Sequence, residues 1–136
     1  MDTVIPSTNT LPPLHHLIAY AIALMLIGVF IGCLVCPHKI AAAACFPEPA
    51  DQPMHVFFYL FAVRELCLGL ALLVFLSYEY WKSATILLAI VGINGISDFL
   101  ISGFHGKEDW RTSFYKHGIP TLIGYYGVLR LWQDNW

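Results

Sequence analysis

Four apolar stretches, each close to the length needed to cross a bilayer, alternate with short polar segments along this chain. They cover about residues 16–36, 54–76, 83–102 and 117–132. A transmembrane helix needs roughly 20 mainly apolar residues, and backbone inside lipid has to be helical because lipid offers it no hydrogen-bond partners. The pattern predicts an all-α integral membrane protein, folded as an up-down-up-down four-helix bundle.

The remaining segments are short and polar. We expect residues 1–15 to form a flexible tail, residues 16–132 the four-span bundle and residues 133–136 a polar stub. The segment 37–53 forms the first loop between spans and contains a short Ala-rich stretch. The segment 103–116 forms the third loop and holds most of the charge.

The basic residues outside the spans are unevenly distributed between the two ends of the predicted bundle. Those on the side of the first and third loops outnumber those on the other side: Lys39, Lys107, Arg111 and Lys116 against Lys82 and Arg130. Because positive residues favour the cytosolic side, we expect these two loops to be cytosolic. We place the protein in the membrane of the endoplasmic reticulum.

Composition excludes several classes of protein. Hydrophobic residues make up 58% of the 136 residues and charged residues only 12%, against about 25% charged in typical globular chains. A soluble domain of this size cannot bury so much apolar surface. The net charge of −2 and the absence of a basic run argue against nucleic acid as a partner.

A pair of charged residues, Arg64 and Glu65, lies in the middle of the second apolar stretch. Such a charge costs between about 2.5 and 17 kcal/mol when it faces lipid, depending on the reference state. Both side chains are therefore expected to face protein or water and to have partners. An ionisable residue at this depth is a candidate for function.

Other polar residues of the predicted spans lie between the membrane midplane and the side of the first and third loops. Asn94 and Asp98 are four residues apart, which puts them on one helix face. His55 and His117 open the second and fourth spans on that same side. We predict that these residues and Glu65 line one cavity, with Arg64 reaching Asp98 or Asn94.

Further residues complete the predicted cavity. Phe58 shares the helix face of His55 and Glu65, and Tyr125 and Tyr126 of the fourth span can bring a hydroxyl to the cavity. A purely structural interpretation remains open, in which Arg64 and its carboxylate partners only lock helix packing. His117 can likewise be an interfacial anchor, and the two tyrosines can be core aromatics.

The spacing of histidines and cysteines favours neither a metal site nor a redox site. No span carries a His-x-x-x-His or Glu-x-x-His pattern, and the Cys33-x-x-Cys36 pair has no second pair to relay electrons. We therefore expect neither a metal nor another cofactor.

Several short motifs together resemble a known family. They are a Gly-rich first span ending in Pro37, the pair Phe46-Pro47, the run Val63-Arg64-Glu65 followed by Leu68-Gly69, Asp98, and His117-Gly118. Over residues 25–132 the chain resembles the small four-span membrane proteins grouped as domain of unknown function 4267, similar in outline to the DoxX-like bundles. That family has Arg-Asp where this chain has Arg64-Glu65.

The resemblance implies architecture more than chemistry. Fungal members of the family are similar to small membrane proteins of secondary-metabolite biosynthesis, among them isomerases, cyclases and four-span anthrone oxidases. This association favours an enzyme that acts on a lipophilic biosynthetic intermediate.

The leading hypothesis is a cofactor-free acid/base isomerase or cyclase acting on a lipophilic polyketide- or terpenoid-like molecule. Glu65 or Asp98 would be the base and His117 or a tyrosine the acid, while Arg64 and Asn94 would hold a carbonyl or enolate oxygen. His55, Phe58 and the two tyrosines would bind substrate.

Two alternatives belong to other functional classes. One is a small carrier or exporter that uses an intramembrane carboxylate, and the other is a non-catalytic membrane scaffold. The expected partners are the lipophilic substrate and membrane lipid. The Gly28-x-x-x-Gly32 pair can serve packing within the chain or a homo-oligomer.

Overall fold

The computed structural model describes residues 11–136, and all regular elements in this part of the chain are helices. In chain order they are α1 (Leu14–Val35), α2 (Pro37–Ala43), α3 (Val56–Ser77), α4 (Trp81–His105), α5 (Trp110–Ser113), the π-helical turn η1 (Phe114–Gly118) and α6 (Ile119–Asn135). The prediction of an all-α protein is thereby confirmed.

Three of the helices, α1, α3 and α4, are long and apolar enough to cross a membrane. They correspond to the first three predicted spans, and each of their ends lies within three residues of the predicted one. The chain is therefore a membrane protein. The fourth predicted span, 117–132, falls on η1 and α6, which are not among these three helices.

The first helix begins earlier than predicted, so the N-terminal tail ends before residue 15. Residues 1–10 of that tail lie outside the described residues, and α1 already begins at Leu14 instead of residue 16. The carbonyl of Pro13 accepts the backbone N–H groups of His16 and Leu17 at 2.9 and 3.2 Å. This proline therefore starts the helix two residues before the apolar pattern indicates it.

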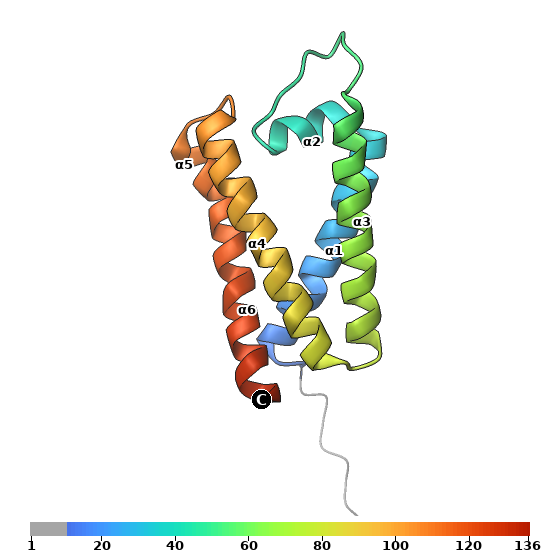
Figure 1. Cartoon of the computed structure of the whole chain (residues 1–136), viewed down its shortest axis with the longest axis vertical. Coiled ribbons are helices and arrows are strands. Elements are labelled where there is room, and N and C mark those ends of the chain that lie inside the picture. Colours follow the sequence, from blue (N-terminus) through green and yellow to red (C-terminus); the bar gives the residue numbers. More distant parts are fainter. Residues whose placement is uncertain (1–10) are drawn as a thin grey trace, which may run out of the picture.

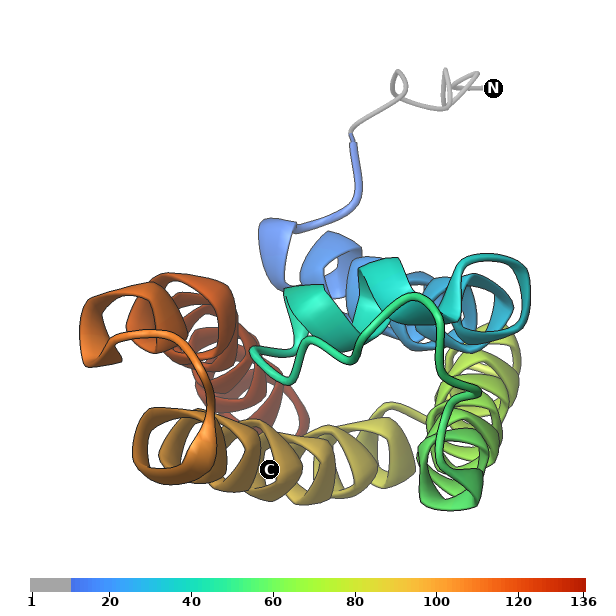
Figure 2. The same ribbon diagram turned by 90° about the horizontal axis from the view of Figure 1, so that it is seen from above.

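The four long helices surround a common axis, with α1 packed on α3 and α6, and α4 packed on α6 and α3. Figure 1 shows that α4 and α6 lean away from α1 and α3 toward the end where α2 lies. Seen from above, α2 runs from the end of α1 toward α6 across this end of the molecule (Figure 2). The two ends of the bundle are thus closed in different ways.

The end of the bundle opposite α2 is closed by a hydrophobic core. Its fully buried residues come from all four long helices: Ala19, Ala23, Leu72, Leu76, Ala84, Leu88 and Leu131. The hydroxyl of Tyr20 donates to the carbonyl of Leu76 at 3.1 Å. Small residues on α1 let the neighbouring helices approach closely, which is how membrane helices associate where lipid gives no hydrophobic driving force.

Two glycines of the long helices differ sharply in their surroundings. A Cβ added to Gly69 on α3 would lie 2.9 Å from the carbonyl oxygen of Ala23 and 3.1 Å from Cβ of Leu26, both on α1. A Cβ added to Gly28 meets nothing within 4 Å, and one added to Gly32 meets the side chain of Ile40 on α2. Gly32 therefore serves packing within the chain.

We expect Gly69→Ala to destabilise the protein by about 1–3 kcal/mol, because the methyl group overpacks a contact made by backbone. Gly28→Ala is the matched control: it adds the same methyl group in open space and should leave stability unchanged or slightly raised. Thermal unfolding in detergent, followed by circular dichroism, measures both. Equal effects of the two substitutions would contradict the close α1–α3 contact.

Candidate functional site

A cavity of about 280 Å³ lies at the α2 end of the bundle, between the start of α3, the later part of α4 and the turn η1. The segment 44–55, which joins α2 to α3, contributes further residues. Four polar side chains line the cavity: Glu48, His55, Asp98 and His117. They come from three separate parts of the chain, so only the tertiary fold brings them together.

The rest of the cavity wall is apolar. It consists of three aromatic and four aliphatic residues: Phe46, Phe58, Phe61, Ala41, Ala44, Met54 and Ile101. A concave, mostly apolar site with a few polar groups is typical of sites for small molecules. The volume is at the low end for such sites, which suits a ligand that places only one part of itself in the cavity.

Local sequence explains how His117 reaches the cavity. It belongs to the π-helical turn η1, and Pro120 follows within the first turn of α6. Proline has no N–H and its ring clashes with the carbonyl four residues earlier, so the regular helical bonding pattern cannot run through this point. Single π-helical turns of this kind often occur at functional sites.

Asp98, on α4, connects the cavity to the charged pair on α3. Arg64 donates from both Nε and Nη2 to Oε1 of Glu65, at 2.9 and 2.6 Å. Its Nη2 also lies 4.0 Å from Oδ2 of Asp98. One guanidinium therefore faces two carboxylates that come from different helices.

Arg64 and Glu65 do not line the cavity themselves. Glu65 is buried, whereas the side chain of Arg64 is 42% exposed and lies over the ring of Phe61, with Cζ 5.0 Å from the ring centroid. Arg64 therefore contacts two residues of the cavity wall, Phe61 and Asp98, without lining the cavity itself. The predicted arrangement, with Glu65 facing the cavity, is not what the structure shows: Glu65 is turned toward Arg64.

The remaining predicted site residues divide into two groups. His55 and Phe58 line the cavity as predicted, and Nδ1 of His55 also accepts the N–H of Phe57 at 3.3 Å. Asn94, Tyr125 and Tyr126 are not among the lining residues.

The two tyrosines lie elsewhere for different reasons. A Cβ added to Gly92 on α4 would lie 2.8 Å from Cζ of Tyr125, so this ring fills the contact between α4 and α6. Tyr126 is 48% exposed on the outer face of α6.

Four residues that are important to the cavity were absent from the predicted site: Phe46, Glu48, Met54 and Phe61. Phe61 follows Phe58 by three residues, and this helical spacing was a usable signal. The other three come from the segment before α3, which has no periodic pattern from which its folding over the cavity follows.

The first and third loops are hydrogen-bonded to each other beside residues that line the cavity. The Lys107 N–H donates to the carbonyl of Cys45 at 3.0 Å, and Nζ of Lys107 donates to the carbonyl of Pro47 at 2.7 Å. Cys45 has φ of 68°, a left-handed conformation that is uncommon for a residue with a side chain. The turn at Cys45 therefore depends on its contacts with the third loop.

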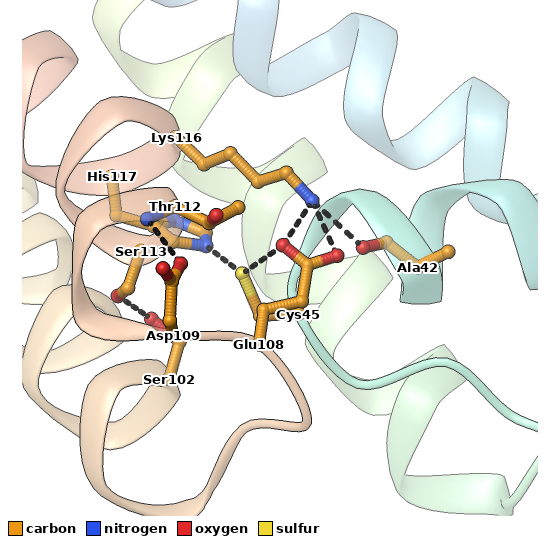
Figure 3. Close-up of polar contacts among 9 residues, drawn as sticks. All are labelled: Ala42, Cys45, Ser102, Glu108, Asp109, Thr112, Ser113, Lys116 and His117. Atoms are coloured by element: carbon orange, nitrogen blue, oxygen red, sulfur yellow. Dashed lines mark hydrogen bonds and ion pairs between the residues drawn. The ribbon is translucent and has the colours of Figure 1, made fainter.

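A polar cluster reinforces this link, as Figure 3 shows. Nζ of Lys116 donates to both carboxylate oxygens of Glu108, at 2.9 and 2.8 Å, and to the carbonyl of Ala42 at 3.3 Å. Sγ of Cys45 lies 3.7 Å from Oε2 of Glu108 and 3.9 Å from Nε2 of His117. Through Cys45 the cluster thus contacts the imidazole of His117, which lines the cavity.

A serine pair fixes the start of the same segment. The hydroxyls of Ser102 on α4 and Ser113 on α5 are hydrogen-bonded to each other, and Ser113 Oγ also donates to the carbonyl of Phe99 at 3.0 Å. Asp109 caps α5 by accepting the N–H of Thr112 at 2.9 Å, and this hydrogen bonding lowers the pKa of the Asp109 carboxyl. These contacts set where η1 begins.

Burial raises the pKa of the Cys45 thiol, and the neighbouring carboxylate of Glu108 raises it further, while the ammonium of Lys116 acts in the opposite direction. The thiol is therefore protonated at neutral pH and donates to Glu108. Cys45 is a structural donor here, because nucleophilic cysteines need a lowered pKa and solvent access.

Over residues 11–136, no group of three or more His, Cys, Asp and Glu side chains is placed to hold a metal ion.

We expect the two charged neighbours of Cys45 to shift its reactivity in opposite directions. Glu108→Gln removes a negative charge and should lower the pKa of the thiol, whereas Lys116→Met should raise it. The pH dependence of alkylation by iodoacetamide measures this in a variant with Cys33, Cys36 and Cys67 replaced by alanine. A shift in the same direction for both variants would show that Cys45 reports loop opening instead of local charge.

Comparison with known families gives one match. A family model described as "Domain of unknown function (DUF4267)" matches residues 21–131, a range that includes every residue lining the cavity. Comparison with curated proteins and with solved structures finds no match. Because the family model covers most of the 136 residues, the chain belongs to the DUF4267 family, a family defined by a domain of unknown function.

Proposed function

We propose that this protein is a membrane enzyme that isomerises or cyclises a lipophilic biosynthetic intermediate by acid/base chemistry in the cavity at the α2 end. The observation that carries the proposal is that Asp98 and His117, from α4 and η1, line the same largely apolar cavity. A carboxyl group and an imidazole are the two side chains most suited to proton transfer at physiological pH. The apolar wall suits a substrate that partitions into the bilayer.

The charged pair on α3 has a supporting role in this proposal. Arg64 makes two short bonds to Glu65 and only a 4.0 Å contact to Asp98. Asp98 is therefore held near a positive charge without being fully neutralised by it. Arg64 and Glu65 act as positioning residues, while Asp98 and His117 make the proton transfers.

The membrane arrangement that we propose has four spans in an up-down-up-down bundle, with α6 as the fourth span. This helix has 17 residues, a rise of about 26 Å at 1.5 Å per residue. The turn η1 extends it at the end nearest α2. The first and third loops then lie on one side of the membrane, which we propose to be the cytosolic side of the endoplasmic reticulum.

A mass-neutral conversion is the expected signature of this activity. Membranes containing the protein, incubated with a lipid extract of the producing cells, should convert one lipophilic compound into an isomer of the same mass with a different retention time. Asp98→Asn and His117→Gln should each slow the conversion by about 100-fold or more, because general acid/base groups contribute factors of that size. Liquid chromatography with mass spectrometry measures the loss of one isomer and the gain of the other.

A second carboxylate–imidazole pair in the same protein provides matched controls. His15 Nε2 lies 2.7 Å from Asp134 Oδ2 at the opposite end of the bundle. Asp134→Asn and His15→Gln make the same chemical changes there and should leave the conversion rate unchanged.

Other outcomes would overturn the proposal in favour of the alternatives. A compound that accumulates across a pH gradient without forming an isomer would indicate a carrier. Full product formation by both Asp98→Asn and His117→Gln would indicate a scaffold.

The proposed topology is tested separately by cysteine accessibility. In a variant without native cysteines, His105→Cys on the third-loop side and Gln133→Cys near the C-terminus should be labelled from opposite sides of sealed microsomes by a membrane-impermeant maleimide. Both positions are exposed in the structure. Labelling of both from one side would mean that α6 does not cross the membrane.

A further inference from the structure

We infer that the substrate is a lipophilic alkene that reacts through a carbocation, and that the cavity consequently selects lipophilic cations over neutral and anionic molecules of the same size. This inference rests on the proposed function and narrows its substrate class to terpenoid-like alkenes, as opposed to carbonyl compounds that react through an enolate. The charges and the aromatic rings around the cavity carry it.

The charge of the residues around the cavity favours a positively charged ligand. The lining residues, all from the described part of the chain, include the acidic Glu48 and Asp98 and neither lysine nor arginine. The nearby cations Arg64 and Lys116 already face carboxylates, at 2.6 Å from Glu65 and 2.8 Å from Glu108.

Electrostatic complementarity then decides which intermediate the site suits. An enolate needs a donor or a positive charge aimed at its oxygen, and no such permanent charge lines this cavity. The imidazoles of His55 and His117 are positive only when protonated. A positive intermediate, by contrast, lies beside the carboxylate that Asp98 becomes once it has given up its proton.

The aromatic rings of the cavity wall also favour a positively charged ligand. Phe46, Phe58 and Phe61 supply three of the eleven lining residues and come from two different segments. The face of an aromatic ring attracts cations, more strongly where water is excluded. Arg64 already lies over the ring of Phe61. Among the described contacts no cation lies over Phe46 or Phe58, so these two rings can accept a cation bound in the cavity.

The resulting reaction balances without a co-reactant. The carboxyl of Asp98 gives its proton to one alkene carbon: the O–H bond breaks, the π pair becomes the new C–H bond, and the other alkene carbon becomes positive. His117 then takes a proton from the next carbon, whose C–H pair becomes the new double bond. The proton passes from the imidazolium back to the carboxylate of Asp98, which restores both groups. Attack by a second double bond before this step gives a ring of the same mass.

Binding of charged and neutral probes tests the inference. The full-length protein, in phosphatidylcholine nanodiscs, is titrated with radiolabelled N,N-dimethyldecylamine, 1-decanol and decanoate, with empty nanodiscs as background. We expect the amine to bind at least about 10-fold more tightly than decanol and decanoate to bind more weakly than decanol. The amine either takes up the proton of Asp98 or meets the ionised carboxyl as an ammonium ion, and both routes give a charge-assisted hydrogen bond that decanol cannot make.

Two substitutions test the contributions of the carboxyl group and of the aromatic rings separately. Asp98→Asn should lower the affinity for the amine about 10-fold and leave that for decanol unchanged. Phe58→Leu keeps an apolar side chain without the ring, so it should also weaken the amine selectively. Asp134→Asn is the control and should change neither affinity.

Each failure has a distinct meaning. Saturable binding of decanol without preference for the amine, or a preference for decanoate, overturns the inference and leaves the proposed function standing. Absence of saturable binding by all three probes overturns both. An amine preference that survives Asp98→Asn and Phe58→Leu, in protein that elutes as wild type on size exclusion, also overturns the inference.

Discussion

The structure depends on how a single guanidinium inside an apolar helix is compensated. Arg64 is bonded to Glu65 on its own helix and faces Asp98 on α4 at 4.0 Å. Because unpaired charge is expensive in a medium of low dielectric, Arg64 stays with these carboxylates and so links α3 to α4. It also leaves a carboxylate incompletely neutralised at the cavity wall.

The two ends of the bundle differ in how closely the long helices approach one another. At one end small residues such as Ala19 and Ala23 let the helices close on a core of leucines. At the other end the helices diverge, and α2 and the segment after it cover the space instead of side chains filling it. The packed end therefore holds the helices in the positions that leave a cavity at the other end.

The candidate site was predictable where helical periodicity governs side-chain direction. The shared face of His55 and Phe58, and the depth of Asp98 and His117, followed from spacing alone, and all four line the cavity. Glu65 was wrongly predicted to line the cavity, because periodicity gives the direction of a side chain but not its partner. Its carboxylate is hydrogen-bonded to the adjacent Arg64 instead. The loop residues Phe46 and Glu48 had no periodic signal at all.

What the sequence determined by itself was the helical, membrane-embedded character of the chain, because long apolar runs leave no other way to satisfy the backbone in lipid. It also indicated that the polar residues within the apolar stretches, such as Arg64, Glu65 and Asp98, lie between the middle of the helices and one end. Only the tertiary structure decided which of them share a cavity, since that depends on the divergence of α4 and α6 from α1 and α3 and on the covering loops. Those contacts join residues far apart in the chain, and no local pattern encodes them.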